Sequence, residues 1–402
     1  MENDIVIVGA GICGLATALA LHRKGLKSIV LERSSALRSD GGALEIHNNG
    51  WCVLDQLGIA TELRKKAVRL EAINDVLLDT GKTVERTLIW KEELRCMKRK
   101  DLIEALFNAI PREYIRFGCQ LKMLKTDAMT SFPELHCSDG SIIKAKVLIG
   151  CDGVNSVVAK SLKLANPRFM PICATRGLTS YPKGHGLENK FTRVMLGTVD
   201  FGLLTITDSL VHWFIGRPML PTDSECQDHP ELIKKSSLDA LKGFPQELID
   251  TVKQCDLKSL YLTQVKYRAP WNLLFTGFRN GTITVAGDAM HAMGPFQGQG
   301  AGSSLEDALV LARCIAREMC KATKSEGGIG DHHELQQRIE GAMDRYVKER
   351  RLRIIRCSLQ TYVVGMLLGA SSMVKKLLVL AVYIIFFSGT SLSLAGFDCG
   401  RL

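Results

Sequence analysis

The sequence predicts an α/β protein with one domain built on a parallel sheet, a second domain built on an antiparallel sheet, and a C-terminal helical region. Three observations predict this class. An apolar segment meets a glycine-rich turn and a helix near the N-terminus, strand patterns dominate the middle of the chain, and helical patterns follow residue 331. The chain has 402 residues, too many for one simple core, so more than one domain is expected.

The N-terminal stretch carries the pattern of a dinucleotide-binding fold. Residues 5–8 are apolar and mostly β-branched, as in a buried parallel strand, and they lead into Gly9, Gly11 and Gly14. Gly9 permits the tight turn, Gly11 lets the backbone approach a pyrophosphate, and Gly14 lets the helix pack on the strand. A second apolar strand ends at Glu32, where a carboxylate can bind a ribose hydroxyl. Together these features predict a Rossmann-like site but do not choose between NAD and FAD.

Two arginines and an acidic turn are further candidates for contact with a dinucleotide. Arg38 lies in a polar turn from which it could reach the pyrophosphate, although a surface position is as compatible with the pattern. Arg99 opens a helix predicted to end near residue 109, where a guanidinium can hydrogen-bond a phosphate. Asp152 and Gly153 follow a buried strand, which favours a functional loop over a simple hairpin turn.

A second glycine-rich stretch again lies between a strand, residues 282–286, and a helix, residues 303–319. Its backbone amides are therefore expected to face an anionic or electron-rich ligand. A carboxylate at the end of the strand can accept a hydrogen bond from a sugar or ribityl hydroxyl. The candidate binding residues of this stretch are Asp288, Pro295, Gly298, Gly300, Ala301 and Gly302.

The middle of the chain predicts an antiparallel sheet with a substrate pocket. Residues 70–95 alternate between apolar and polar side chains around a turn at Thr80 and Gly81, and residues 218–245 predict a loop with one short helix. Trp213 and Phe214 are candidate pocket residues, although aromatic side chains are more often part of a core. The other predicted strands cover residues 193–199, 202–207 and 211–217.

These patterns divide the chain into three parts. The cofactor domain is discontinuous and the second domain is inserted into it, so each is made of several segments. We assign residues 1–70, 96–165 and 277–330 to the cofactor domain, residues 71–95 and 166–276 to the substrate domain, and residues 331–402 to the C-terminal helical region.

Composition restricts the location and the partners. The net charge of +10 suits an anionic cofactor, an anionic substrate or a membrane surface, and no motif for binding nucleic acid is present. The thirteen cysteines include no CxxC pair and no cluster at metal-ligand spacing, which indicates reduced thiols and no metal site. The first strand begins at residue 4 and leaves no room for a targeting peptide, so a cytoplasmic location is expected.

The C-terminal region combines a basic helical pattern over residues 345–356 with a largely apolar stretch over residues 362–395. Within this stretch, residues 377–387 are eleven apolar residues, fewer than the roughly 20 that a membrane-spanning helix needs. The combination permits a peripheral membrane contact. The alternative is a helical layer packed on the cofactor domain.

The order and spacing of the three motifs resemble those of the single-component, FAD-dependent aromatic hydroxylases of the p-hydroxybenzoate and salicylate hydroxylase type. The resemblance covers residues 3–320, and the ending Phe397–Leu402 looks most like the plant monooxygenase branch near zeaxanthin epoxidase. It implies that FAD is bound by Gly9, Gly11, Gly14, Glu32, Arg33, Arg38, Arg99, Asp152, Gly153, Asp288, Pro295, Gly298, Gly300, Ala301 and Gly302. In this family Asp152 and Gly153 would lie between FAD and the path of NAD(P)H. Many members have asparagine at position 302, where this chain has glycine.

The resemblance also implies a reaction. NAD(P)H would reduce FAD, O2 would form a flavin C4a-hydroperoxide, and one oxygen atom would hydroxylate or epoxidise a small aromatic or isoprenoid-like substrate. A catalytic base is not identified by the pattern; His212, Tyr181 and Tyr267 are weak candidates, and His291 is as compatible with a turn-stabilising role. The alternatives are a reductase-type flavoenzyme and a non-catalytic FAD-binding protein. The oligomeric state is left open.

Overall fold

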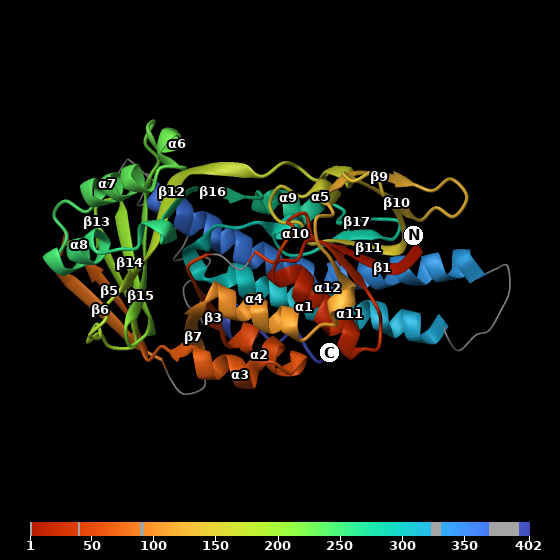
Figure 1. Ribbon diagram of the computed structural model, residues 1–402, viewed down its shortest axis with the longest axis horizontal. Coiled ribbons are helices and arrows are strands. Elements are labelled where there is room, and N and C mark those ends of the chain that lie inside the picture. The colour runs from red at the N-terminus through yellow and green to blue at the C-terminus, as the bar shows by residue number, and fades with distance from the viewer. Residues whose placement is uncertain (1, 39–40, 89–91, 323–330, 370–393) are drawn as a thin grey trace.

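A computed structural model describes residues 2–38, 41–88, 92–322, 331–369 and 394–402. The molecule is elongated, with one sheet at each end and a long C-terminal helix that extends along most of its length (Figure 1). The fold matches the predicted class, because a mostly parallel sheet, an antiparallel sheet and a C-terminal helical segment are all present.

The first sheet is built around β1 (Glu2–Val8), whose side chains from Ile5 to Val8 are buried. β1 is parallel to β2 (Ile29–Leu31) on one side and to β11 (Ile142–Gly150) on the other. The order β17-β18-β11-β1-β2-β8 is completed by β17 (Arg279–Asn280), β18 (Ile283–Val285) and β8 (Ile115–Arg116), and β9 (Leu121–Thr126) and β10 (Pro133–Cys137) extend it beside β11. The helices that share its core include α1 (Ile12–Arg23), α4 (Arg99–Asn108) and α11 (Gln299–Ala322).

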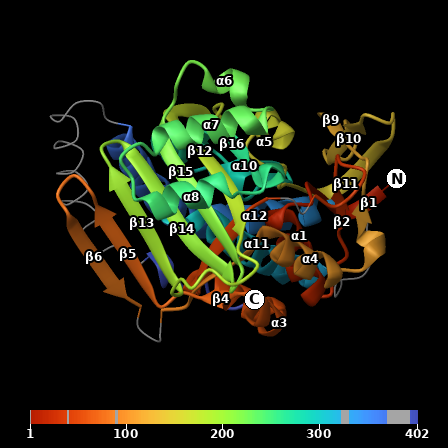
Figure 2. The ribbon, with the colours of Figure 1, turned by 60° about the vertical axis from the view of Figure 1, so that its left-hand side comes forward.

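The second sheet has the order β16-β12-β15-β14-β13-β5-β6 and lies at the opposite end of the molecule (Figure 2). Its strands are β5 (Ala72–Leu77), β6 (Lys82–Thr87), β12 (Arg168–Ser180), β13 (Lys190–Leu196), β14 (Val199–Thr207), β15 (Leu210–Pro218) and β16 (Tyr261–Tyr267). All neighbouring strands are antiparallel except β13 and β5. β5 and β6 thus reach this sheet from a distant part of the chain.

One face of the second sheet is covered by helices that the sequence pattern underestimated. The segment 218–245, predicted as a loop with one short helix, contains α6 (Asp223–Cys226) and α7 (Pro230–Ala240), and α8 (Gln246–Lys253) follows. Pro230 at the first position of α7 suits a helix start. Ile233 and Val252 of these helices pack with Trp213 and Phe201 of the sheet in one apolar cluster.

A three-stranded sheet connects the two ends of the molecule. It pairs β3 (Ala43–His47) with β7 (Leu94–Lys98), and β7 with β4 (Val68–Arg69). Two helices, α2 (Asn48–Leu57) and α3 (Ala60–Lys66), follow β3 directly, and Gly58 ends α2 in the left-handed conformation. The short elements elsewhere are η1 (Arg112–Tyr114), α5 (Val157–Ser161), η2 (Leu257–Ser259), α9 (Pro270–Phe275), α10 (Asp288–His291) and η3 (Pro295–Gln297).

The C-terminal region contains one long helix, α12 (Asp331–Leu368), which packs against α11 and α9. Its basic stretch is directed partly inward: Arg350 and Arg353 are buried, and Arg351 donates to the carbonyl oxygens of Leu273 and Leu274. Among the helices of the described residues, none is long and apolar enough to cross a bilayer. The apolar run 377–387 lies outside the described residues.

Candidate functional site

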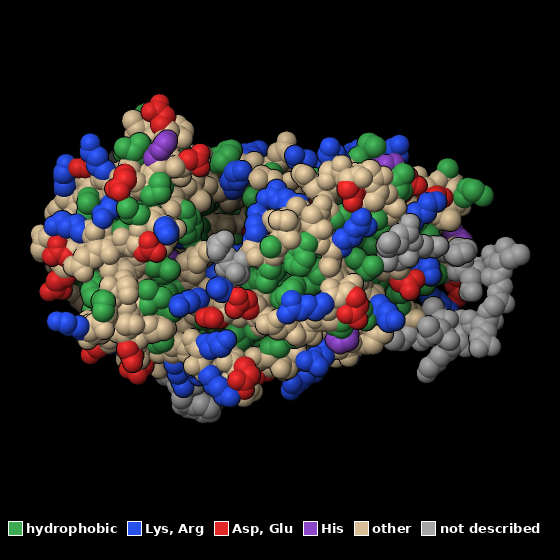
Figure 3. Space-filling view, in the orientation of Figure 1, with side chains coloured by type: hydrophobic (Ala, Val, Ile, Leu, Met, Phe, Trp, Pro, Cys, Tyr) green, Lys and Arg blue, Asp and Glu red, His purple; other side chains and the backbone are tan. Residues whose placement is uncertain are grey.

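A cavity of about 810 Å³ lies between the first sheet and the second sheet. On one side it is bounded by the start of α1, by Arg99 and Asp288, and by the loop over residues 293–301. On the other side it is bounded by strands of the second sheet, and β3 lies between the two walls. In the space-filling view a recess separates the two parts of the molecule (Figure 3). The cavity therefore joins the predicted cofactor motifs to the predicted substrate sheet.

The three glycines of the first motif occupy positions that a side chain would disturb in different ways. Gly9 has a φ of +103°, which favours glycine. A Cβ at Gly14 would lie only 1.9 Å from the carbonyl oxygen of Gly9, so α1 packs on the turn only without a side chain there. A Cβ at Gly11 would meet no heavy atom within 4 Å, and Gly11 lines the cavity. Its backbone is therefore open to a ligand.

Glu32 and its neighbouring arginines do not line the cavity. The buried Glu32 carboxylate accepts hydrogen bonds from the backbone N–H groups of Ala10 (2.9 Å) and Ser34 (3.0 Å). Arg38 lies 3.5 Å from Glu32 and its side chain is 58% exposed, and Arg33 is exposed. In this structure Glu32 stabilises the first turn through these backbone hydrogen bonds, and Arg33 and Arg38 are exposed to solvent.

Arg99 and Asp288 place opposite charges on the wall of the same cavity. Arg99 is the first residue of α4, and its N–H donates to the carbonyl oxygen of Gly42 (3.0 Å). Burial lowers the pKa of Arg99, whereas Tyr261 and Asp288 raise it. Burial raises the pKa of Asp288, whereas His291 and Arg99 lower it. A cation for phosphate and an acceptor for hydroxyl groups are thus available together.

The predicted role of Asp152 beside a ligand is not matched by its position. Its carboxylate accepts hydrogen bonds from the hydroxyl of Ser156 and from the N–H of Val157 (2.7 Å), at the start of α5. The side chain therefore binds the start of α5, whose N-cap residue is Ser156, and it is not among the residues that line the cavity. Gly153, with a φ of +79°, does line the cavity. Asp152 accordingly fixes the turn whose backbone is exposed at Gly153.

The second glycine-rich stretch forms one edge of the cavity. Pro295 opens η3, Gly298 ends it with a φ of +59°, and α11 begins at the next residue. The residues of this stretch that line the cavity include Pro295, Gly298, Gly300 and Ala301. Gly302 is not among them, and a Cβ at this position would lie 2.8 Å from Nδ2 of Asn49. Asn49 thus occupies the space beside Gly302.

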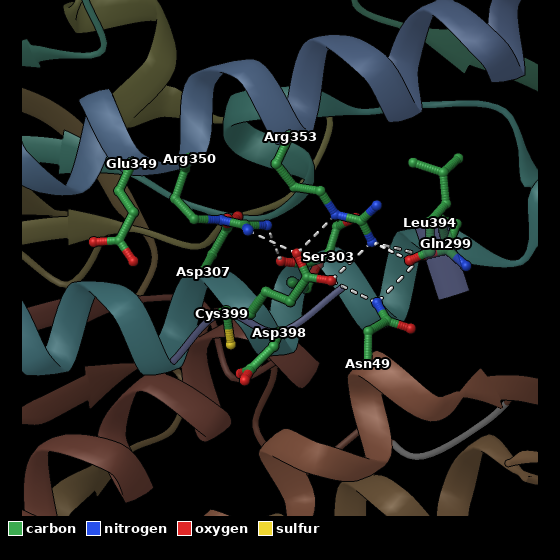
Figure 4. A network of polar contacts seen from close by, with 12 residues as sticks. Asn49, Gln299, Ser303, Asp307, Glu349, Arg350, Arg353, Leu394, Asp398 and Cys399 are labelled. Carbon is green, nitrogen blue, oxygen red and sulfur yellow. Dashed lines mark hydrogen bonds and ion pairs between the residues drawn. The ribbon is translucent and has the colours of Figure 1, made fainter. Parts of the chain in front are cut away.

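This edge is held by a buried network of polar side chains, in which residues of α2, α11 and α12 converge (Figure 4). Asn49 donates to Glu306 (2.5 Å) and Gln299 (3.3 Å). Arg353 donates to the same two side chains, at 2.9 and 3.2 Å, and to the carbonyl oxygen of Leu394 (2.7 Å). The C-terminal segment 394–402 is therefore tied to the loop, and Ala395 and Gly396 of this segment line the cavity.

The same network continues to the Gly287–Asp288 turn. Arg350 pairs with Glu306 (2.6 Å) and with Asp307 (2.7 Å), and all three side chains are fully buried. Asp307 also bonds Nε2 of His291 (2.6 Å) and the N–H of Gly287 (2.9 Å). Burial alone would raise the pKa of Asp307, but His291 and Arg350 lower it to about 2. Because His291 is inside this network, its position supports the turn-stabilising role.

On the second sheet, the alternation of side chains separates the two predicted pocket residues. Phe214 lines the cavity. Trp213 is fully buried on the opposite face, where it stacks on Phe201 at 6.3 Å between ring centroids and donates to the hydroxyl of Thr179 (3.0 Å). The prediction for Trp213 is wrong, because adjacent residues of a strand face opposite sides.

The three candidate bases also have different positions. His212 lines the cavity, and its Nδ1 lies 3.1 Å from the carbonyl oxygen of Gly177. Tyr181 instead bonds the hydroxyl of Thr251 (2.9 Å), and Tyr267 packs against Tyr362, so neither belongs to the cavity wall. Since a carbonyl only accepts, Nδ1 carries the proton and Nε2 remains an acceptor. Burial lowers the pKa of His212 to about 4, which keeps the ring neutral.

The cavity wall also includes titratable residues that the sequence pattern did not identify, among them Glu45, His47, Arg193 and Asp200. Glu45 and His47 alternate on β3, so a polar residue at every second position of this strand was the available signal. Arg193 donates to Asp75 (2.8 Å), and burial raises the pKa of Asp200 to about 6, against the effect of Arg193.

Comparison with known proteins identifies the family. The family described as FAD binding domain matches residues 2–345. Two proteins of Arabidopsis thaliana are similar to this chain along its whole length: Monooxygenase 1 is 42% identical over 411 aligned positions and covers 100% of both chains, and Monooxygenase 2 is 36% identical over 404 and covers 99% and 98%. Both relatives agree with the expected resemblance to plant monooxygenases.

The fold is also found in a solved structure of HpxO from Klebsiella pneumoniae, complexed with FAD and uric acid. The TM-score is 0.80 at 17% sequence identity, and the match covers 98% of this chain and 96% of HpxO. At this identity the comparison establishes the fold. Together with the family match over residues 2–345 and the two long relatives, it identifies this chain as a member of the FAD-dependent monooxygenase family.

Proposed function

We propose that this protein uses NAD(P)H and O2 to insert one oxygen atom into a small aromatic or isoprenoid-like substrate. The observation that carries the proposal is one continuous cavity whose walls combine the FAD-binding motifs with the second sheet. FAD, when bound, supplies the electron transfer from NAD(P)H and the activation of O2. The protein binds the reactants, orients them and restricts access of water.

The described residues fit FAD at one end of this cavity. The open backbone at Gly11 and the N-terminal amides of α1 suit the pyrophosphate, because the first turn of a helix has N–H groups without acceptors in the helix. Arg99 would add positive charge, and Asp288 would accept hydrogen bonds from the ribityl hydroxyls. The start of α11 would stabilise negative charge on the ring system. We further propose that NAD(P)H binds transiently, because the sequence holds one dinucleotide fingerprint.

At the other end, His212 and Phe214 would contact the substrate. Nε2 of His212 is the ring nitrogen that this tautomer leaves as an acceptor, and it would accept a hydrogen bond from a substrate hydroxyl. Phe214 would provide an apolar surface; its ring lies 6.1 Å from that of Phe191, which also lines the cavity.

Replacement of His212 with leucine is expected to lower kcat/KM for a hydroxylated substrate about tenfold, because a buried substrate hydroxyl would lose its acceptor. The measurement is steady-state NAD(P)H oxidation with product analysis. Tyr181→Phe serves as the control, since its hydroxyl bonds Thr251 away from the cavity. Equal losses of kcat/KM in the two variants would show that His212 does not bind the substrate.

The proposed function is tested with the purified full-length protein. We expect flavin absorption bands, release of FAD on heating, and NAD(P)H-dependent consumption of O2 that a phenol, an alkene or urate stimulates. Incorporation of ¹⁸O from ¹⁸O₂ into the product would establish oxygenation. A protein that neither contains nor takes up FAD would overturn the proposal. Oxidation of NAD(P)H without incorporation of oxygen into any compound would support the reductase alternative.

A further inference from the structure

The short helix α9 exposes three large apolar side chains on the outside of the molecule. Phe275 is 90% exposed, and Trp271 and Leu274 are exposed as well, whereas Leu273 is buried. Large apolar side chains are normally buried, because their transfer out of water is favourable. Arg351 of α12 donates to the carbonyl oxygens of Leu273 and Leu274 and so holds α9 on the long helix. The three side chains are therefore presented from a fixed support.

The outer face of α12 continues this apolar surface. Leu352, Leu359 and Met366 are exposed and follow one another at intervals of seven residues, which places them on one face of the helix. Tyr362 lies about one turn from Leu359 and from Met366. Its ring packs edge-on against that of Trp271, at 5.5 Å between ring centroids. The exposed apolar side chains of the two helices are therefore neighbours, and together they form what we call the α9–α12 surface.

The charge around the α9–α12 surface is positive. The segments 266–278 and 351–393 contain no Asp or Glu, whereas both contain Lys and Arg. The exposed Arg168 lies over the ring of Trp271, with 5.5 Å between the guanidinium carbon and the ring centroid, and Arg356 of α12 is also exposed. Aromatic and aliphatic side chains beside cations are typical of helices that lie on an anionic membrane surface.

A second copy of this chain fits the α9–α12 surface less well than a lipid surface does. Two copies that met through it would bring cationic side chains together, and each chain carries a net charge of +10. The carboxylates earlier on α12 do not offset this charge, because Asp344 pairs with Arg279 and Glu349 pairs with Arg313. Anionic lipid head groups supply the missing negative charge directly beside an apolar layer.

The chain that follows α12 has the same composition as the α9–α12 surface. Residues 370–393 contain only two charged side chains, both lysines, and residues 377–387 are all apolar. The exposed stripe of α12 thus leads along the chain into a sequence that is apolar and basic as well. This continuity favours a lipid partner over a soluble one.

We propose that the α9–α12 surface binds peripherally to a bilayer that contains anionic lipids. Leu274 and Phe275 enter the boundary between head groups and acyl chains, and the indole of Trp271 lies at the level of the head groups. Arg168 and Arg356 attract the negative charge of the lipids. Both helices lie along the membrane surface. The inference goes beyond the proposed function and does not depend on it.

The test is co-sedimentation of the complete, FAD-loaded chain with vesicles of phosphatidylcholine that contain about 30% phosphatidylserine. We expect the native protein to bind these vesicles, to lose about tenfold in affinity between about 50 and about 500 mM NaCl, and to bind pure phosphatidylcholine weakly. The salt dependence separates the contribution of the cations from that of the apolar side chains.

The double variant Leu274→Ser with Phe275→Ser is expected to bind the anionic vesicles about tenfold or more weakly, because two apolar side chains no longer enter the membrane. Met129→Ser is the matched control, since Met129 is 96% exposed in the turn between β9 and β10, and this variant should bind as the native protein does. Far-UV circular dichroism and FAD content establish that each variant is folded.

Trp271→Phe provides a second measurement. The variant retains an aromatic ring, so it should still bind the vesicles. Lipids that carry a nitroxide near the head group should quench the tryptophan fluorescence of the native protein, and this quenching should decrease in the variant. Trp51 and Trp213 are fully buried and out of reach of the lipid label.

Three results would overturn the inference. The first is a native protein that binds neither kind of vesicle. The second is undiminished vesicle binding by the double variant, which would place the contact elsewhere on the chain. The third is a dimer that the double variant dissociates, without vesicle binding, which would assign the surface to a second copy. None of these measurements requires NAD(P)H or O2, so the proposed function is tested separately.

Discussion

Gly14→Val is expected to abolish FAD binding and to destabilise the protein by about 4 kcal/mol or more, because its side chain has no space. A Cβ at this position would lie 1.9 Å from the carbonyl oxygen of Gly9 and 3.3 Å from Cβ of Cys151. Gly9 belongs to the turn that joins β1 to α1, and Cys151 directly follows β11, so the helix would have to move away from the sheet. Thermal unfolding and the ratio of absorbance at 450 and 280 nm measure the two effects.

Gly11→Ala is the matched control for this prediction. A Cβ at Gly11 meets no protein atom within 4 Å, and the residue is not in the left-handed region, so folding should be nearly unchanged. The added methyl group would project where the cofactor is proposed to lie, so FAD affinity should fall. If Gly14→Val were as stable as Gly11→Ala, the close packing of α1 on the first turn would be refuted.

Arg350→Met is expected to cost about 3–5 kcal/mol of unfolding free energy, the range for loss of one partner from a buried ion pair. Arg350 is fully buried between Glu306 and Asp307, and methionine retains the apolar stem but not the charge (Figure 4). Glu306 would then keep Arg353 and Asn49 as partners, and Asp307 would keep His291 and the N–H of Gly287, but the core would hold two carboxylates with one cation fewer. Urea denaturation at pH 7 measures the loss.

The same network should make the unfolding free energy of the native protein fall at acidic pH. The pKa of Asp307, about 2, is below its ordinary value of 3.8, so its contribution to stability is complete above pH 3.8 and is lost as the pH falls toward 2. Arg350→Met should reduce this dependence. Arg345→Met is the control, because Arg345 is half-exposed where it pairs with Glu318, and such pairs contribute at most about 1 kcal/mol. Equal stability of the two variants would contradict the prediction.

The parts of the fold that depend on local pattern could be predicted from the sequence. The strand, turn and helix around Gly9 to Gly14 follow from short-range rules: β-branched residues for a buried strand, and glycines where backbone and helix approach closely. The strands of the second sheet follow from alternation. The helices α6 and α7 were underestimated, because their apolar face becomes clear only once the sheet that they cover is known.

The direction of side chains at the site could not be predicted in the same way. Trp213 and Phe214 are equally aromatic, and only the register of β15 between β12 and β14 decides which of them faces the cavity. Asp152 has the position expected of a loop carboxylate, but a hydroxyl and an N–H at the start of α5 engage it. Glu45 could not be recognised as a cavity residue from the sequence, because its proximity to Gly298 joins two positions that are more than 250 residues apart in the chain.

The position of the last residues has a consequence for biosynthesis. Ala395 and Gly396 form part of the cavity wall, and Arg313 and Arg353 hold the carbonyl oxygens of Cys399, Arg401 and Leu394. The glycine turn near residue 9 leaves the ribosome long before them, so the cavity wall of a nascent chain lacks Ala395 and Gly396 until late in translation. Stable capture of FAD should therefore require that residues 394–402 have been translated and have packed against α11 and α12.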